Sequence, residues 1–122
     1  MKQHLVHLVV ATAAAAALVV GGATPAWATA TVFSSGGSAT YNSPANQMSV
    51  SDTNCDNRYQ YSLHNWGTSQ SSSSATRIEN HGGCGSTFNV GLSPTNSQIT
   101  FRTCTEIPNG PDSCSGWTTT PA

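Results

Sequence analysis

Four cysteines are the feature that most constrains how this chain folds. An even number of cysteines in a short exported chain is typical of a domain stapled by disulfides. Four cysteines allow three pairings, and we expect Cys55 to pair with Cys84 and Cys104 with Cys114. The second pair encloses nine residues, and the turn-forming sequence of residues 108–111 brings the flanking strands within bonding range. A structural metal site would need cysteines two to four residues apart, and the sequence has no such pair.

Residues 1–28 are typical of an export signal. One charged residue, Lys2, precedes a long apolar run, and an Ala-x-Ala site ends at Ala28. This pattern predicts cleavage before Thr29, which leaves one domain, residues 29–122, outside the cell. At about 20 residues the apolar run is long enough to span a bilayer, but the glycines and the proline that follow it favour cleavage. We therefore expect a secreted protein with no membrane contact after cleavage.

The expected mature domain is small and carries few charges. Removing 28 of 122 residues leaves 94, a length that buries little apolar surface. Disulfides compensate for this, at about 2 to 4 kcal/mol each. The domain has three arginines, no lysine and five carboxylates, so its net charge is minus two with histidine neutral. Nucleic-acid binding needs clustered cations to neutralise phosphates, and this composition argues against such a partner.

Beyond the signal, apolar and polar residues alternate instead of repeating every 3.6 residues, which predicts an all-β chain. In the stretch 58–64, Tyr59, Tyr61 and Leu63 share one face, which we expect to lie in the core. The other face of this strand, which includes His64, is then expected to be solvated. Further strands are expected at residues 31–33, 47–50, 76–78, 87–90, 98–103 and 115–120.

Turn-forming sequences separate these strands at intervals of roughly ten residues. The rhythm predicts an antiparallel β-sandwich of about seven strands in one domain with two disulfides. A small β-barrel is the alternative, because it would give the same spacing. The serine-rich segment 69–74 is interpreted as a hairpin loop, since neither side of it is long enough to be a separate domain.

The last strands give a specific expectation about register. Ile99 and Phe101 are predicted to point inward. If the last two cysteines lie directly opposite each other, antiparallel pairing places Phe101 across from Trp117, on the face opposite the sulfurs. A bulge would break this contact, and Gly116 is the place where one would form.

Two motifs carry a family resemblance. The first is V-x-D-T-x-x-D at residues 50–56, and the second is F-R-x-C at residues 101–104 followed by C-S-G-W at residues 114–117. In these motifs the chain resembles small secreted proteins of actinobacteria, a group with no assigned biochemical role. The resemblance implies an exported, disulfide-containing β-sandwich, and it supplies no catalytic residues.

The first motif also contains possible metal ligands. Asp52, Asn54 and Asp56 reproduce the opening of a calcium loop, in which alternating oxygens converge on one cation. The glutamate expected at position twelve of such a loop is Leu63 here. We therefore favour a turn stabilised by Asp and Asn side chains, with calcium as the minor alternative. No cofactor is expected.

Catalysis is not expected either. His64 and His81 could join an aspartate and a serine in a hydrolase triad, but no G-x-S-x-G motif or comparable nucleophile context is present. The many serines make chance matches frequent. We interpret the segment 83–86 as a turn around a bridged cysteine, and we predict a protein that is not an enzyme.

Three aromatic residues are not assigned to the core by their pattern: Tyr41, Trp66 and Trp117. Exposed rings beside amide side chains are the means by which extracellular β-sandwich modules bind sugars. The alternative is that the tryptophans seal the ends of the sandwich, because tryptophan is rarely fully buried. The favoured function is a non-catalytic extracellular module that binds a glycan or a cell-wall surface.

The alternative function is inhibition or antagonism of an extracellular hydrolase. The segment closed by the last two cysteines begins with Thr105, which is followed by Glu106, Ile107 and Pro108. A rigid exposed loop binds a protease without losing ordering entropy, and Glu106 is expected at its tip. The partner would then be a secreted protein instead of a polysaccharide.

Overall fold

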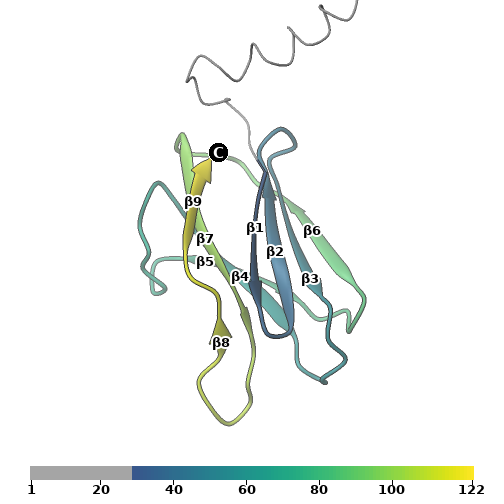
Figure 1. Cartoon of the computed structure of the whole chain (residues 1–122). Coiled ribbons are helices and arrows are strands. Elements are labelled where there is room, and N and C mark those ends of the chain that lie inside the picture. Colours follow the sequence, from purple (N-terminus) through teal and green to yellow (C-terminus); the bar gives the residue numbers. More distant parts are fainter. Residues whose placement is uncertain (1–28) are drawn as a thin grey trace, which may run out of the picture.

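The computed structural model describes residues 29–122, and the predicted export signal lies outside these residues. The described residues are all β and form two antiparallel sheets that pack face to face (Figure 1). The predicted sandwich is confirmed, and the barrel alternative is wrong, because the two sheets stay separate and each has open edges. The strands are β1 (Thr29–Ser34), β2 (Gly37–Asn42), β3 (Gln47–Asp52), β4 (Gln60–Trp66), β5 (Thr76–Asn80), β6 (Thr87–Gly91), β7 (Gln98–Thr105), β8 (Ser113–Cys114) and β9 (Thr118–Pro121).

The four-stranded sheet has the order β1-β2-β3-β6, and the five-stranded sheet has the order β5-β4-β7-β8, with β9 also paired to β7. Nine strands within residues 29–122 replace the seven or so expected. One addition is β2, which begins at Gly37 and lies between the strands predicted at residues 31–33 and 47–50. An added Cβ at Gly37 would lie 2.0 Å from the carbonyl oxygen of Ser51, so this glycine allows close strand pairing. The other addition is β8, which lies just before the strand predicted at residues 115–120, and β9 corresponds to the second half of that predicted strand.

The serine-rich segment is a hairpin loop, as predicted. It joins β4 to β5, which pair antiparallel. The side-chain nitrogen of Asn65 donates to the backbone carbonyl oxygens of Ser69 at 3.1 Å and Ser71 at 3.0 Å. These bonds hold the loop against the sheet. Within residues 29–122 the structure has no helix of the length and apolar character that a bilayer crossing requires.

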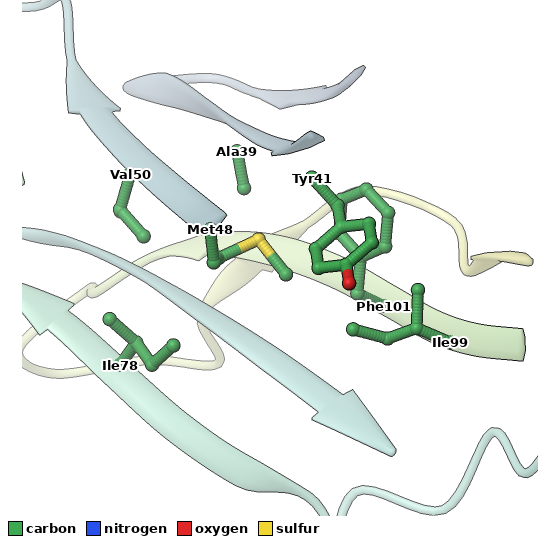
Figure 2. Close-up of a cluster of buried hydrophobic side chains, with 7 residues drawn as sticks. All are labelled: Ala39, Tyr41, Met48, Val50, Ile78, Ile99 and Phe101. Atoms are coloured by element: carbon green, nitrogen blue, oxygen red, sulfur yellow. The ribbon is translucent and has the colours of Figure 1, made fainter. Parts of the chain in front are cut away.

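The main core lies between the two sheets (Figure 2). Four side chains of this core come from the four-stranded sheet, and three come from the five-stranded sheet. Burying a large apolar side chain contributes about 1.5 to 3 kcal/mol, so this cluster stabilises the packing of the two sheets. Its members are Ala39, Tyr41, Met48, Val50, Ile78, Ile99 and Phe101. The inward direction predicted for Ile99 and Phe101 is confirmed.

The predicted inner face of β4 is wrong. His64 lies opposite Phe101 in the register, so His64 points between the sheets and is only 3 % exposed. Tyr61 and Leu63 lie on the outer face, where they form a second apolar cluster with Cys104. Alternation shows which residues share a face, but it does not show which face meets the other sheet. Here the more polar face is the inner one.

A hydrogen-bond network makes this polar inner face possible. The side-chain nitrogen of the fully buried Gln60 donates to Ser34 Oγ at 2.6 Å and to Thr103 Oγ1 at 2.7 Å. Its side-chain oxygen accepts from Thr105 Oγ1 at 2.8 Å. A buried amide is costly without partners, and these three bonds join β1, β4 and β7 across the sandwich.

Both predicted disulfides are present, Cys55–Cys84 and Cys104–Cys114. The first joins two connections that cross between the sheets, one from β3 to β4 and one from β5 to β6. The second lies on the outer face of the five-stranded sheet, where Cys104 and Cys114 are direct cross-strand partners.

The predicted contact of Phe101 with Trp117 is wrong. The register between β7 and the C-terminal segment changes by one residue after the disulfide, so Phe101 lies opposite Thr118. The extra residue is a bulge at residues 116–117. It turns Trp117 to the outer face, where the Arg102 guanidinium carbon lies 4.7 Å from the centre of its ring.

Candidate binding face on the five-stranded sheet

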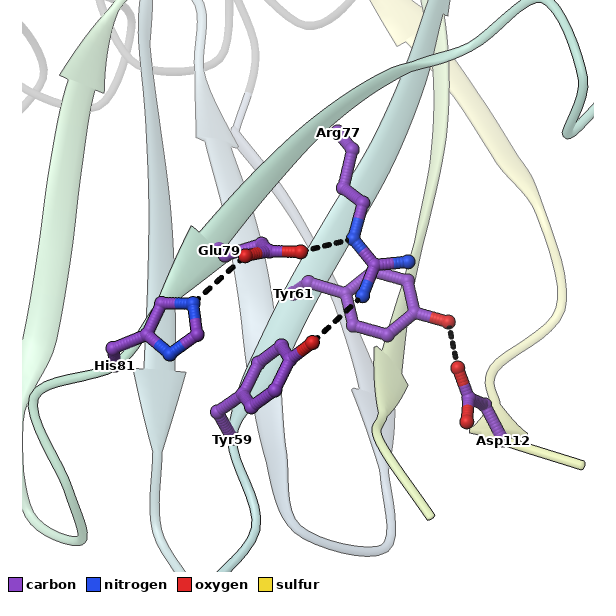
Figure 3. Close-up of polar contacts among 6 residues, drawn as sticks. All are labelled: Tyr59, Tyr61, Arg77, Glu79, His81 and Asp112. Carbon is purple, nitrogen blue, oxygen red and sulfur yellow. Dashed lines mark hydrogen bonds and ion pairs between the residues drawn. The ribbon is translucent and has the colours of Figure 1, made fainter. Parts of the chain in front are cut away.

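The outer face of the five-stranded sheet carries a connected group of aromatic and charged side chains (Figure 3). Tyr61 belongs to β4, and Arg77 and Glu79 belong to β5. Because β4 and β5 are antiparallel partners, Glu79 lies opposite Tyr61. We call this group the tyrosine–arginine cluster, and its members are Tyr59, Tyr61, Arg77, Glu79, His81 and Asp112.

Arg77 lies at the centre of the cluster. Its guanidinium carbon is 3.5 Å from the centre of the Tyr61 ring and 6.0 Å from that of Tyr59, which is cation–π geometry. Its Nε donates to Glu79 at 2.5 Å, and its terminal nitrogen donates to the Tyr59 hydroxyl at 3.2 Å. Burial lowers the pKa of Arg77, but the bonds to Glu79 and Tyr59 outweigh it and raise the pKa. Arg77 therefore fixes the positions of both tyrosine rings.

Glu79 and His81 extend the cluster toward the end of the sheet. His81 Nε2 lies 2.7 Å from the second carboxylate oxygen of Glu79. This bond, together with the bond from Arg77, lowers the pKa of Glu79. The His81 ring also stacks on Tyr59, with 4.2 Å between the ring centres. Tyr59, itself half-buried, is thus held in place by both neighbours.

Tyr61 anchors the opposite side of the cluster. Its hydroxyl donates a hydrogen bond to Asp112, which precedes β8. Burial and this bond raise the pKa of Tyr61 to about 12. The pKa of Asp112 is lowered by the backbone N–H of Ile107 and by the Tyr61 hydroxyl. The two pKa shifts favour an ionised Asp112 and a neutral Tyr61. These are the protonation states in which the Tyr61 hydroxyl donates to the Asp112 carboxylate.

Trp117 completes the face. It is half-buried and packs against the apolar cluster of Tyr61, Leu63 and Cys104. Arg102 lies over its ring and donates to Ser72 Oγ at 2.7 Å. The face therefore presents two partly exposed rings, those of Tyr59 and Trp117, around a buried apolar centre.

A hollow adjoins the cluster at the end of the sandwich, beside the Cys55–Cys84 disulfide. Its volume is about 480 Å³, within the range of roughly 300 to 1,000 Å³ found for small-ligand sites. Tyr59 and His81 belong both to the cluster and to the wall of the hollow, so the two features are continuous. The full lining is Asp52, Asn54, Cys55, Asn57, Arg58, Tyr59, His81, Gly83 and Cys84.

The three aromatic residues selected from the sequence do not form one surface. Tyr41 is a correction, because its ring is fully buried in the main core and cannot meet a ligand. Trp66 lies at the edge of the core and contacts Tyr41 edge-to-face, with ring centres 6.4 Å apart. This position fits the sealing role. Only Trp117 lies on the outer face, and Tyr59 was missed because it had been assigned to the core.

The possible calcium ligands form turns. Asp52 Oδ1 accepts the N–H of Asn54 at 3.2 Å, and Asp56 Oδ1 accepts the N–H of Arg58 at 3.1 Å. Asn57, between the latter two, has a left-handed backbone with φ of 60°. Each carboxylate therefore accepts a hydrogen bond from the backbone N–H two residues further along the chain, which is the geometry of an Asx turn. No group of three or more histidine, cysteine or acidic residues in residues 29–122 is placed to hold a metal ion.

The two histidines do not meet. His81 lies on the outer face of the five-stranded sheet, whereas His64 is buried on the inner face. The prediction of a solvated His64 is therefore wrong. Burial lowers its pKa, and its Nδ1 has no hydrogen-bond partner among the described residues.

Glu106 is not at the tip of the second disulfide loop, which corrects the prediction. It lies at the base, half-buried, where its backbone N–H donates to the Tyr59 carbonyl oxygen at 3.0 Å. The half-buried Ile107 is held by Asp112, which accepts its backbone N–H at 3.0 Å. The exposed tip is residues 108–111.

The site combines stacking surfaces, hydrogen-bonding groups and charges on a rigid sheet. One pattern could have identified it from the sequence, since Arg77, Glu79 and His81 alternate and must share a face of one strand. Comparison of the chain with protein-family models, with curated proteins and with solved structures finds no match, so this geometry is the basis for assigning a function.

Proposed function

We propose that this protein is a secreted, non-catalytic module that binds an extracellular or cell-wall glycan. The observation that carries the proposal is the presence of two half-buried rings, Tyr59 and Trp117, on one face beside hydrogen-bonding side chains. Apolar rings stack on the faces of sugars, while polar groups around them bond to sugar hydroxyls. Secretion is supported by the export-signal pattern of residues 1–28 and by the two disulfides.

Rigidity favours this use of the face. Tyr59 is held by His81 and Arg77, and Trp117 is held by Arg102. Side chains that are already ordered lose little entropy when a ligand binds, whereas free ones lose about 0.5 to 1.5 kcal/mol each. The cluster therefore offers binding surface at a low entropic cost.

The test is co-sedimentation of the oxidised mature protein with peptidoglycan, chitin, cellulose and whole cell walls. We expect selective pelleting that falls at least about tenfold in Trp117→Ala and in Tyr59→Ala, because each ring supplies stacking surface. Phe33→Ala is the matched control, since Phe33 is 71 % exposed on the other sheet. Retention of the protein in every supernatant, or equal losses in all three variants, would contradict the proposal.

A second candidate function rests on the disulfide loop. Its tip, residues 108–111, is exposed, and its base is fixed by the hydrogen bond from Ile107 to Asp112. Such a preorganised loop suits inhibition of an extracellular hydrolase. Residual activity of a panel of secreted proteases tests this function. An inhibitor would lose potency or change its preference in Asn109→Lys, whereas a glycan-binding module would be unaffected.

A further inference from the structure

We propose that the glycan bound by this face is acidic, and that Arg58 in the adjoining hollow binds its carboxylate. This inference rests on the proposed function and narrows it to a substrate class. It follows from the positions of the charges among residues 29–122, from the partners that these charges have, and from the residues that line the hollow around Arg58.

All the cations of residues 29–122 apart from histidine border one side of the molecule. Arg77 lies over Tyr61, Arg102 lies over Trp117, and Arg58 lines the hollow beside Tyr59. A neutral polymer does not need this arrangement. A ligand with spaced negative charges would meet Arg58 beside the Tyr59 ring and Arg102 over the Trp117 ring.

Two of the three arginines have no carboxylate partner. The ion pairs within the described residues join Glu79 to Arg77 and to His81, and neither includes Arg58 or Arg102. Arg102 still donates to a serine and stacks on a ring. Arg58 is exposed, and its side chain makes no hydrogen bond within the described residues. Its fork of donors is therefore free for a ligand.

The acidic groups near the hollow are already engaged. Asp52, which contributes to the lining, is 2 % exposed, and its Oδ1 accepts the N–H of Asn54. Asp56 accepts the N–H of Arg58 itself. Glu79 is neutralised by Arg77 and approached by His81. Of Asp52 and Arg58, the two charged side chains that line the hollow, Arg58 is thus the exposed one, although the domain as a whole is negative.

The lining of the hollow also provides the groups that a charged sugar requires. The stacked rings of Tyr59 and His81 form one wall, and the amide side chains of Asn54 and Asn57 contribute hydrogen-bonding groups. The guanidinium group binds a carboxylate through two parallel hydrogen bonds, which an ammonium group cannot reproduce. A sugar ring packed against Tyr59 would therefore direct its carboxylate to Arg58.

The test compares two forms of one polymer. Polygalacturonate and its methyl ester share a backbone, but only the first carries carboxylates. Calorimetric titration of the oxidised mature protein should show at least about tenfold tighter binding to polygalacturonate, and the preference should weaken as salt is raised. Arg58→Gln should bind both forms equally, and Arg58→Lys should retain only part of the preference.

Thr40→Glu is the control, because it changes the net charge by the same amount on the exposed face of the other sheet. It should keep the full preference for the carboxylate form. Equal binding of both polymers by the native protein, or a preference that survives in Arg58→Gln, would overturn the inference while leaving glycan binding intact. Absence of binding to either polymer would also overturn it, and the cell-wall panel then decides separately whether the proposed function stands.

Discussion

The outer face of the four-stranded sheet carries no charged side chain, whereas that of the five-stranded sheet carries two arginines, a glutamate and a disulfide. The first face is hydroxyl-rich, and hydroxyl pairs such as Thr31 with Thr40, at 2.8 Å, link neighbouring strands. The second face covers an apolar cluster around Tyr61 and Leu63. One sheet therefore packs on a single side, and the other packs on both.

This difference shows where stability and function coincide. In β4, every residue from Gln60 to Asn65 is buried, because the sandwich core covers one side and the outer cluster covers the other. The residues that bind a ligand in our proposal rest on this doubly packed sheet. The four-stranded sheet contributes its inner side chains to the core, and its outer face is free to vary.

The largest expected effect that tests this comparison is that of Leu63→Ala. Leu63 is 8 % exposed within the outer cluster, and its truncation should lower the free energy of unfolding by about 3 kcal/mol. Thr40→Ala, on the outer face of the other sheet, should change it by less than about 0.5 kcal/mol. Urea denaturation measures both values. Similar losses in the two variants would mean that the faces do not differ in packing.

The second effect concerns the disulfide on the outer face of the five-stranded sheet. Replacing Cys104 and Cys114 together by alanine should destabilise the domain by about 2.7 kcal/mol, because the unfolded chain gains the entropy of an open ten-residue loop. The bulge that follows the bridge should loosen as well. Trp117 should then leave Arg102, and its fluorescence should shift to the red. An unchanged emission spectrum would show that the bulge positions Trp117 without the disulfide.

The same comparison explains what could be predicted from the sequence. The strand class, the sandwich and the Cys104–Cys114 pair depend on alternation and short loops, which are local features, and the other two cysteines are then left to pair with each other. The inner and outer faces of β4 were exchanged in the prediction, because the choice depends on the partner sheet. Three hydrogen bonds offset the cost of burying Gln60 on the inner face. Neighbouring side chains of the outer apolar cluster shield Leu63 from solvent on the outer face. The residues that bond to Gln60 lie on other strands, and so does part of the cluster that covers Leu63, so the sequence of β4 alone could not predict either environment.

The candidate site was predicted less completely, for a related reason. Trp117 was identified as an aromatic residue available for binding, but its neighbours depend on a one-residue bulge. Tyr59 and His81 are far apart in the sequence and meet only because β4 and β5 pair in one particular register. Tyr41 was misassigned because its alternation with threonine and asparagine in β2 was not recognised as a strand.

A smaller effect is expected from Tyr61→Phe, which removes the hydroxyl bond to Asp112. We expect a loss of about 1 kcal/mol at neutral pH, since Asp112 is partly exposed. The bond contributes to a folded-state pKa of Asp112 below the ordinary value of 3.8. Its stabilisation is therefore fully present above pH 3.8 and is lost as the pH falls through the lowered pKa. Unfolding of both proteins followed from pH 7 to pH 2 should show their stabilities converging in acid, and a constant difference would contradict the assignment.

The smallest effect is expected from Phe33→Ser, the most informative substitution on the four-stranded sheet. Phe33 is 71 % exposed, lies on the outer face opposite Ser38 and is a member of neither apolar cluster. Its loss should change the free energy of unfolding by less than about 0.5 kcal/mol and leave glycan binding unchanged. A variant that folds normally but no longer pellets with cell walls would assign glycan binding to the outer face of the four-stranded sheet, because Phe33 lies on that face and belongs to neither apolar cluster.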